Sequence, residues 1–329
     1  MSGSALSRAI QRRWYGQRSI AAFIPLAAIY GAIVALRRTA YRRGWLRAQH
    51  VARPLIVIGN LGVGGSGKTP LTLAVVERAR ALGLRPGVIA RGYGGRSACY
   101  PLSVAADTPA AEAGDEPVLI ARRAAVPVVV DPDRVAAARH LLARADVDLI
   151  IADDGLQHYR LARDAEIAVV DARRGYGNGW LLPAGPLREP RTRLAAVNME
   201  CVHGVRRDFW LEAGAAYGLA DERTRRLDDF RGAAVHAIAG IGEPARFFDM
   251  LEQAGLSLIR HPVPDHHRYR PEDLDFGDDR PVLMTEKDAV KCAAFARTHW
   301  WAVPVITRLS VSCERALDAL LARFAGKSS

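Results

Sequence analysis

Apolar runs alternate with helical patterns over the first two thirds of the sequence. The runs have the length and composition of buried strands, and the stretches between them have helical spacing. The runs lie at 55–58, 85–90, 126–130, 147–152 and 167–170, and the helical patterns at 71–81, 118–123 and 133–145. Because strands that alternate with helices usually form a parallel sheet covered on both faces, we predict an α/β fold.

The last third of the sequence repeats this alternation on a smaller scale. Strands are expected at 235–239, 256–260, 281–284 and 303–311, and helices at 244–254 and 313–324. Three other stretches are expected to be irregular: a loop of small residues at 107–113, a long ordered loop at 171–195, and short strands with a linker at 200–230. We therefore predict a second, smaller α/β domain over 229–329.

A glycine-rich loop joins the first predicted strand to the first predicted helix. The loop has the sequence Gly62-Val63-Gly64-Gly65-Ser66-Gly67-Lys68-Thr69. It fits the phosphate-loop pattern G-x-x-x-x-G-K-[ST] in the strand–loop–helix context that the pattern requires. Glycines let backbone N–H groups turn inward around phosphate oxygens, and the helix N-terminus adds unpaired donors. Lys68 is expected to reach the β- and γ-phosphates, and Thr69 to offer its hydroxyl to Mg²⁺. The sequence thus predicts a phosphate-loop NTPase-like domain over 49–228.

Acidic residues follow a buried strand that is expected beside this loop. Asp153 and Asp154 end the apolar run 149–152, which is where a phosphate loop needs an acidic partner for Mg²⁺. Two adjacent carboxylates there would repel each other unless a cation lies near them. A helix-capping role for one of them is the alternative, and Asp148, which precedes most of the run, is a poorer candidate.

A kinase also needs a base for the hydroxyl of its acceptor. Asp115 and Glu116 lie in a loop expected at the same end of the sheet, with Asp131 and Asp133 as competitors, although Asp133 resembles a helix cap. His266 in the second domain is a candidate base or orienter of a base. A histidine that follows an aspartate is otherwise usually a turn residue.

The N-terminal segment, residues 1–48, combines an apolar run with arginines. Residues 20–36 are 17 residues without a charge, and arginines flank them on both sides. Four interpretations compete: a cleaved signal peptide, a membrane span, an interfacial helix on anionic headgroups, and a helix packed on the soluble body. The interfacial helix fits the flanking charge best.

Composition narrows the class of protein further. Half of the 329 residues are hydrophobic, which excludes global disorder, and the four cysteines show no paired spacing, which argues against a zinc site or disulfide framework. The net charge is +11, but residues 1–50 hold nine arginines and the first acidic residue is Glu77. A uniformly basic nucleic-acid binder would spread this charge over its surface, so we expect no nucleic-acid partner.

Further motifs follow the phosphate loop in a distinctive order. They are Arg91-Gly92-Tyr93-Gly94, Gly114-Asp115-Glu116-Pro117, Asp153-Asp154-Gly155-Leu156-Gln157-His158, Leu182-Pro183-Ala184-Gly185-Pro186-Leu187-Arg188-Glu189-Pro190, Asp265-His266 and Thr285-Glu286-Lys287-Asp288-Ala289-Val290-Lys291. The ordered set resembles the tetraacyldisaccharide 4'-kinase family of lipid A biosynthesis from about residue 20 to the C-terminus. The phosphate loop alone is shared by many NTPases, whereas the whole set is specific. One departure is Leu156, where Phe is expected, and it exchanges one apolar residue for another.

The resemblance implies ATP-dependent phosphorylation of the 4'-hydroxyl of a tetraacyldisaccharide 1-phosphate, giving lipid IVA. It implies a membrane-associated enzyme at the cytoplasmic face of a Gram-negative inner membrane, with two α/β domains joined by a short β-linker. The implied roles are Asp115 as base paired with His266; Lys68, Thr69 and Asp153 or Asp154 on the phosphates and Mg²⁺, with Glu116 near the metal; and Tyr93 and Arg134 on the nucleotide.

Two observations from the residues bear on this interpretation. Arg173, Arg174, Arg188 and Arg191 lie in or beside the long loop and are candidates to bind the 1-phosphate, because guanidinium groups match phosphate oxygens. Solvent-facing loop arginines are the alternative. Two other classes remain open: a membrane-attached phosphate-loop ATPase acting as a switch, and a nucleotide-binding scaffold without chemistry. No N-K-x-D element favours GTP.

Overall fold

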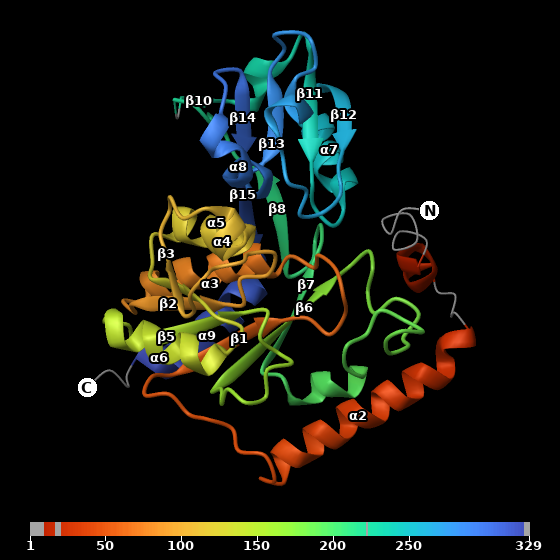
Figure 1. Ribbon diagram of the computed structural model, residues 1–329, viewed down its shortest axis with the longest axis vertical. Helices are drawn as coiled ribbons and strands as arrows, with labels where there is room; N and C mark the ends of the chain where they lie inside the picture. Colours follow the sequence, from red (N-terminus) through yellow and green to blue (C-terminus); the bar gives the residue numbers. More distant parts are fainter. Residues whose placement is uncertain (1–9, 17–20, 222, 326–329) are drawn as a thin grey trace. The chain divides into compact units, whose positions relative to one another are not determined.

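The computed structural model describes residues 10–16, 21–221 and 223–325 (Figure 1). The chain forms two compact units that interleave along the sequence. Unit 1 comprises residues 1–91, 126–210 and 309–329, and unit 2 comprises 92–125 and 211–308. The three consecutive ranges expected from the sequence, 1–48, 49–228 and 229–329, stay a prediction, and the two units are described separately below.

Unit 1 contains a parallel sheet with the strand order β7-β6-β1-β5-β2-β4. Its strands are β1 (Leu55–Gly59), β2 (Pro86–Ala90), β4 (Val128–Val130), β5 (Leu149–Asp153), β6 (Ala165–Asp171) and β7 (Met199–His203), followed by the start of β8 (Phe209–Ala213). Every residue of β1, β2, β4, β5 and β6 is buried. Fully buried strands of this kind need cover on both faces, which explains why the sequence shows continuous apolar runs rather than alternation.

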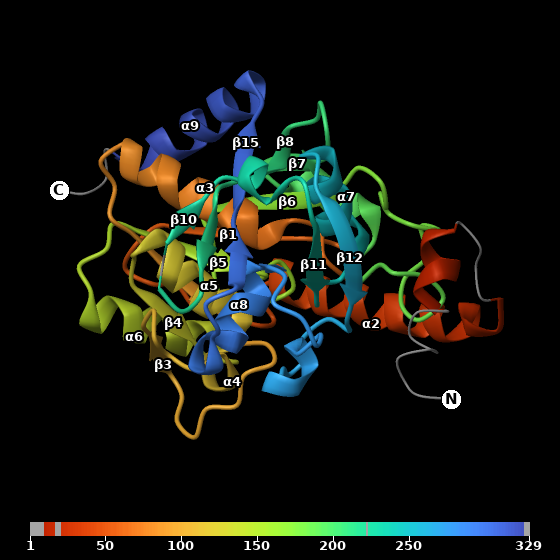
Figure 2. The ribbon, with the colours of Figure 1, turned by 90° about the horizontal axis from the view of Figure 1, so that it is seen from above.

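Helices cover both faces of this sheet. They are α3 (Lys68–Ala81), α6 (Arg134–Arg144), α9 (Val311–Ala325) and the short η2 (Arg191–Ala196). Figure 2 shows α3 and α9 on one side of β1 and β5, and α6 on the other. Leu55 and Val57 of β1 pack with Val135 and Leu141 of α6 in one buried cluster. The fold class predicted from the sequence, an α/β fold with a parallel core and an apolar N-terminal helix, is confirmed.

The N-terminal helix α2 (Ile24–Arg42), preceded by η1 (Ala21–Phe23), packs along unit 1 on one face only. Ala27 and Ala40 are buried, and the Tyr30 hydroxyl donates to the backbone oxygen of Arg188 at 3.0 Å. The segment Ala21–Arg42 is long and apolar enough to cross a membrane by length and composition, although a single such helix near an N-terminus is weak evidence for a span.

Unit 2 contains a six-stranded sheet with the order β10-β9-β14-β13-β11-β12. Its strands are β9 (Ala216–Gly218), β10 (Thr224–Arg225), β11 (Ala234–Ala239), β12 (Ser257–Pro262), β13 (Val282–Thr285) and β14 (Trp300–Val303), with β15 (Val305–Leu309) leading back to unit 1. The central four strands are parallel to their neighbours, whereas β9 and β10 add antiparallel pairs at one edge. The sequence pattern over 200–230 indicated short strands, and these are β7 to β10.

Alternate residues of the central strands in unit 2 build two cores. Val235 and Ala237 of β11 pack with Phe247 and Leu251 of α7 (Pro244–Gln253) on one face. Ile238 packs on the other face with residues of α8 (Glu286–Cys292). The period of two along β11 places these side chains on opposite faces. The unit also contains β3 (Leu102–Val104), α4 (Ala110–Ala113), α5 (Asp115–Ala124), η3 (Leu227–Phe230), η4 (Pro271–Leu274) and η5 (Ala293–Phe295).

One sequence expectation in this unit is corrected. The stretch 107–113 was expected to be a loop of small residues, but residues 110–113 form the helical turn α4. The reason is local: Pro109 precedes the turn, and alanines at 110, 111 and 113 are the best helix formers once Gly114 ends it. Helix α5 likewise begins at Asp115, three residues earlier than the expected start at 118.

Candidate active site

The phosphate loop of unit 1 occupies the turn between β1 and α3, as the sequence predicts. Gly64 and Gly67 have φ values of 100° and 92°, which L side chains rarely adopt, and Gly67 is the residue directly before α3. A Cβ on Gly67 would lie 2.9 Å from Nδ1 of His203. The Ser66 hydroxyl is buried and has no hydrogen-bond partner among the described residues. A buried donor of this kind fits an oxygen-rich ligand held by the loop.

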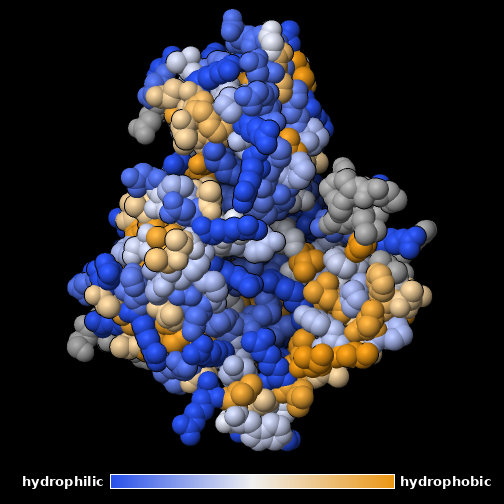
Figure 3. All heavy atoms as spheres, in the orientation of Figure 1, coloured by the Kyte–Doolittle hydropathy of each residue, from blue (hydrophilic) through white to orange (hydrophobic). Residues whose placement is uncertain are grey.

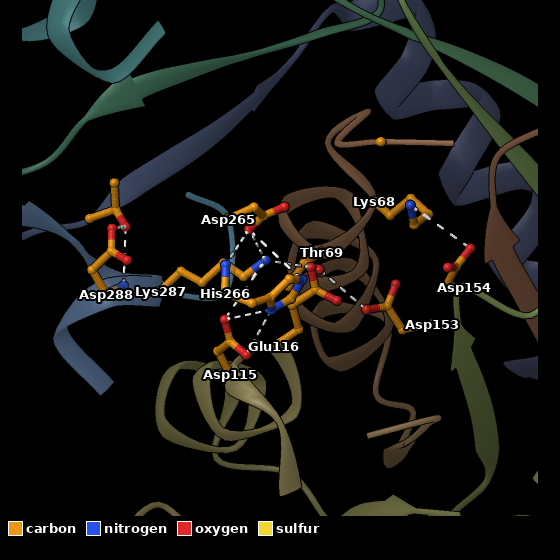
Figure 4. A network of polar contacts seen from close by, with 12 residues as sticks. Lys68, Thr69, Asp115, Glu116, Asp153, Asp154, Asp265, His266, Lys287 and Asp288 are labelled. Carbon is orange, nitrogen blue, oxygen red and sulfur yellow. Dashed lines mark hydrogen bonds and ion pairs between the residues drawn. The ribbon is translucent and has the colours of Figure 1, made fainter. Parts of the chain in front are cut away.

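Lys68 and Thr69 are the first two residues of α3, and Thr69 contacts the carboxylate predicted for it. Its hydroxyl lies 3.3 Å from Oδ2 of Asp153, and the hydroxyl of Thr72, one turn later, lies 3.1 Å from Oδ1 (Figure 4). Asp153 is buried, at 3% exposure, at the end of β5. Two hydroxyls from one helix therefore fix both oxygens of this carboxylate beside the phosphate loop.

Asp154 has a different environment from Asp153. Its φ of 50° lies in the left-handed region, and its carboxylate lies 3.8 Å from Nζ of Lys68 and 3.0 Å from Nη2 of Arg188. Burial raises the pKa of Asp154, but Lys68 and Arg188 lower it by more, so the pKa lies below its ordinary value. Arg188 and Lys68 both also bond to the side chain of Asn60, which precedes the loop. The carboxylate is thus a counter-ion that gathers cations at the phosphate loop.

Arg134, at the start of α6, is buried in the same unit at 3% exposure. One of its nitrogens donates to the backbone oxygen of Asp131 at 2.9 Å, whereas Nε is buried without a partner among the described residues. Burial lowers the pKa of Arg134 to about 10, and the charge of Asp154 acts in the opposite direction. A buried guanidinium with an unused donor fits an anion bound next to Asp154.

The second group of predicted residues lies within unit 2. Asp115 is the first residue of α5, and both of its oxygens lie close to Nδ1 of His266, at 3.2 and 3.1 Å (Figure 4). Burial raises the pKa of Asp115, but the hydrogen bond from His266 and the charge of Lys287 lower it by more, so the carboxyl has a pKa below its ordinary value. The same hydrogen bond raises the pKa of His266. The two side chains form an ion-paired dyad.

Two features of the backbone support this dyad. His266 has a φ of 59°, a conformation that costs a non-glycine residue about 1–3 kcal/mol and persists only where its surroundings fix it. Its backbone N–H donates to Oδ1 of Asp265 at 3.0 Å. On the other side, Gly114 has a φ of 88°, and a Cβ there would lie 2.6 Å from the backbone oxygen of Tyr93. The glycine motifs around Tyr93 and Gly114 therefore allow the close approach that shapes the rim of the dyad.

Lys287, in the first turn of α8, joins three carboxylates of unit 2. Its Nζ lies 3.2 Å from Glu116, 3.3 Å from Asp265 and 3.9 Å from Asp115 (Figure 4). The Lys287 side chain is 14% exposed. Burial lowers the pKa of Lys287, but the three carboxylates raise it by more, so the ammonium stays charged. One cation thus neutralises a group of acids around the dyad.

Lys291 adds a second cation one turn further along α8. Its Nζ lies 3.9 Å from Asp115 and 2.9 Å from Asp288. Asp288 is fully buried and also accepts from the backbone N–H of Gly240 at 2.9 Å and from the hydroxyl of Thr285 at 2.7 Å. These bonds tie the dyad to the floor of the sheet.

The remaining predicted residues have the following positions. The Tyr93 ring is 65% exposed and packs edge-on against His266, with ring centroids 5.1 Å apart. Arg174 lies over the Tyr15 ring at 5.1 Å and beside Gly64, whereas Arg191 lies over Tyr176 at 4.6 Å. The structure leaves the ligands of these residues, of Arg173 and of the phosphate loop as predictions.

Sequence reasoning assigned no role to three residues that the structure brings into these groups. Asn60 and Lys287 lie inside the motifs quoted above, but position in a motif does not reveal which side chain faces inward. Thr72 is polar and fully buried one turn after Thr69, and its spacing of three residues on a helix beside the phosphate loop was the available signal. No cluster of three or more His, Cys, Asp or Glu side chains among the described residues is arranged to hold a metal unaided.

Comparison with known proteins agrees with this geometry. The sequence profile of a family described as Tetraacyldisaccharide-1-P 4'-kinase matches residues 20–323. Proteins named tetraacyldisaccharide 4'-kinase from Alkalilimnicola ehrlichii and Stenotrophomonas maltophilia are each 52% identical to this chain. The first match covers 91% of this chain and 92% of its relative, and the second 86% and 88%.

A solved structure is similar over nearly the whole chain. It is the enzyme of this family from Aquifex aeolicus in complex with ATP, with a TM-score of 0.79 and 27% identity, covering 92% of this chain and 98% of that one. The profile spans far more than half of the sequence, and the relatives are well above 30% identical over most of it. The chain therefore belongs to the tetraacyldisaccharide 4'-kinase family.

Proposed function

We propose that the protein transfers the γ-phosphoryl group of ATP to the 4'-hydroxyl of a tetraacyldisaccharide 1-phosphate, giving lipid IVA. The observation that carries this proposal is the phosphate loop whose lysine and threonine contact Asp154 and Asp153. Family membership supports the reaction, and the ATP complex of the Aquifex relative supports the nucleotide. Loop amides, Lys68 and Arg134 offset negative charge on the phosphate oxygens, and positioning with electrostatic stabilisation dominates catalysis in phosphoryl transfer.

Mg²⁺ is the metal that the phosphate-loop chemistry implies, and the side chains present fit it. Mg²⁺ usually takes one or two carboxylates plus phosphate oxygens and waters, so a cage of several acidic residues is not required. We assign Thr69 and Asp153 to this ion, because the Thr69 hydroxyl and the Asp153 carboxylate already face each other at 3.3 Å. Asp154 is engaged by Lys68 and Arg188 instead. When bound, the ion supplies positive charge to the β- and γ-phosphate oxygens.

Asp115 is the group that takes the proton from the 4'-hydroxyl, in a pair with His266. The lowered pKa of Asp115 keeps the carboxylate ionised at neutral pH. His266 holds both oxygens through Nδ1 and thereby fixes the direction in which the carboxylate faces. Glu116, which the resemblance placed near the metal, contacts Lys287 in unit 2, and a role at the metal remains a proposal for it.

The acceptor is a lipid, and we propose that α2 holds the enzyme on the cytoplasmic face of the inner membrane. The helix has an exposed apolar face formed by Leu26, Ile29, Ile33 and Leu36, seen as the hydrophobic band at the lower right of Figure 3. The opposite face packs on unit 1 along the whole helix, from Ala27 to Ala40. A spanning helix is surrounded by lipid, whereas an interfacial helix has one face on protein, so this arrangement favours the interfacial mode.

The acceptor's 1-phosphate needs cationic partners, and the long loop offers them. Arg173, Arg174 and Arg191 are our candidates. Arg188 is a weaker candidate, because it already bonds to Asp154 and Asn60.

Incubation of the purified enzyme with γ-labelled ATP and the lipid acceptor tests the reaction. We expect label in the lipid product on thin-layer separation, and we expect its loss in Lys68→Met and Asp115→Asn. A switch ATPase would instead release labelled free phosphate without labelling the lipid, and that result would overturn the proposal. A nucleotide-binding scaffold would do neither.

A further inference from the structure

A basic cavity lies between the C-terminal half of α2 and the body of unit 1, apart from the site described above. Its volume is about 340 Å³. The lining side chains come from α2, from the turn before β6, from β6 itself and from the segment around η2. They are Arg38, Tyr41, Arg42, Tyr159, Arg163, Ala165, Glu166, Arg193, Ala196 and Asn198. Four guanidinium groups thus face a cavity with a single lining carboxylate.

The paired and unpaired groups of this cavity divide cleanly. Glu166 is bonded to Arg163 at 2.9 Å and to Arg193, so this carboxylate is already saturated with cations. Arg38 and Arg42, one helical turn apart on α2, have no ion-pair partner among the described residues. Their charges are therefore available to an anion in the cavity.

Neutral donors accompany the two free cations. Asn198 uses its side-chain oxygen to accept from the backbone N–H of Glu166 at 2.8 Å, which leaves its NH₂ group as a donor. The Tyr41 ring stacks on Tyr159 with centroids 5.8 Å apart, and no described residue accepts from its hydroxyl. Guanidinium, amide and hydroxyl donors around one space are the groups that bind phosphate oxygens.

The position of the cavity separates it from the phosphate loop. Ala165 and Glu166 are the first residues of β6, whereas the phosphate loop follows the last residue of β1. The two strands are parallel, with Ile56 paired to Ala165, so the cavity and the loop lie at opposite edges of the same sheet. Five residues of strand span roughly 16 Å. An anion in the cavity is therefore distinct from the phosphates of a bound nucleotide.

The cavity also continues the exposed apolar face of α2. Leu26, Ile29, Ile33 and Leu36 are all about half exposed or more, and Trp45 and Leu46 are exposed just after the helix. Arg38 and Arg42 lie between these two apolar groups in the sequence. A molecule with acyl chains along the helix would place its polar head near the arginines, whereas a small soluble anion would make no use of the apolar face.

We propose that this cavity binds the phosphate group of an anionic membrane phospholipid, which is not the acceptor of the reaction. The lipid would fasten the C-terminal end of α2 to the inner leaflet while its chains follow the exposed apolar face. The inference rests on the membrane attachment proposed above and is independent of the assignment of catalytic residues.

Titration of the full-length enzyme in neutral detergent with dihexanoyl phosphatidylglycerol tests the site, because neutral micelles carry no attractive surface potential. We expect saturable binding, weakened about tenfold or more in R38Q/R42Q. The matched control is R37Q/R43Q, which removes the same charge from the same helix outside the cavity lining and should change binding less than twofold. Label transfer to the acceptor in detergent should be unchanged in both variants, and equal melting temperatures would show that both fold.

Three outcomes would overturn the proposal: no saturable binding to the wild-type enzyme, equal weakening in the two double variants, or binding of glycerol 3-phosphate as tight as that of the phospholipid. The second outcome indicates diffuse attraction, and the third a site for a soluble anion. Flotation of the wild-type enzyme with neutral vesicles tests membrane attachment by itself, so failure of attachment and failure of the cavity are distinguishable.

Discussion

Replacement of Lys287 by methionine is the sharpest test of how unit 2 prepares its dyad. Nζ of Lys287 lies 3.9 Å from Asp115, and the two side chains are 14% and 6% exposed. Two unit charges at about 4 Å attract each other by about 4 kcal/mol at an effective dielectric constant of about 20. Lys291 remains at the same distance and keeps part of this effect. We therefore expect a rise of roughly one unit in the pKa of Asp115, equivalent to about 1.4 kcal/mol.

The stability of the variant follows from the same charges. Because the pKa of Asp115 is lowered in the folded protein, its ionised form stabilises the fold above the pKa of an unfolded aspartate. This contribution is lost as the pH falls through the folded value. Removal of Lys287 leaves Asp115, Glu116 and Asp265 without their shared cation. We expect a loss of about 3 kcal/mol at neutral pH, and a smaller loss in acid.

The assay is the pH dependence of kcat/KM for label transfer to the lipid acceptor, with urea unfolding measured in parallel. The acidic limb of the profile should move to higher pH in Lys287→Met and stay in place in Lys287→Arg, which keeps the charge. If stability falls while the two profiles superimpose, Lys287 is a purely structural residue and our electrostatic reasoning is wrong.

Three further changes test the remaining parts of the site. Asp115→Asn should lower kcat by roughly 10²–10⁴ with ATP affinity retained in a fluorescent-nucleotide titration, and NMR should show the pKa of His266 falling toward its ordinary value; near-normal turnover would refute the base. Gly67→Ala places a side chain at a φ of 92° and should weaken ATP binding at least tenfold by calorimetry, against an unchanged affinity if the loop adapts. Thr72→Val leaves one oxygen of buried Asp153 without its 3.1 Å donor and should cost about 1–3 kcal/mol in urea unfolding, and an unchanged midpoint would show that water replaces the hydroxyl.

Local signals were sufficient for the phosphate loop and for the fold class. The loop lies between a strand of five buried residues and a helix that begins at Lys68, because glycines at positive φ and a strand–loop–helix order are encoded within about 25 residues. The cap at Asp133 was also predictable, and its side chain accepts from the backbone N–H of Val135. Each of these features depends on neighbours in the sequence.

Contacts distant in the sequence were not predictable in the same way. Asp115 and His266 meet across 151 positions, and Lys287 reaches Glu116 across 171. Spacing left His266 as one candidate among several, and only the family resemblance paired it with Asp115. No periodicity indicates that 92–125 groups with 211–308, because that grouping depends on which surfaces bury each other after folding.

The last helix has a consequence for the biosynthesis of this protein. Helix α9 belongs to unit 1, where Leu317, Leu321 and Phe324 are buried and where Asp318 and Glu314 bind Arg78 of α3. Helix α3 carries the phosphate-loop lysine, yet the helix that packs on it leaves the ribosome last. The nucleotide-binding unit therefore cannot be completed during translation, and early termination within the final 20 or so codons should cost ATP binding before it disturbs unit 2.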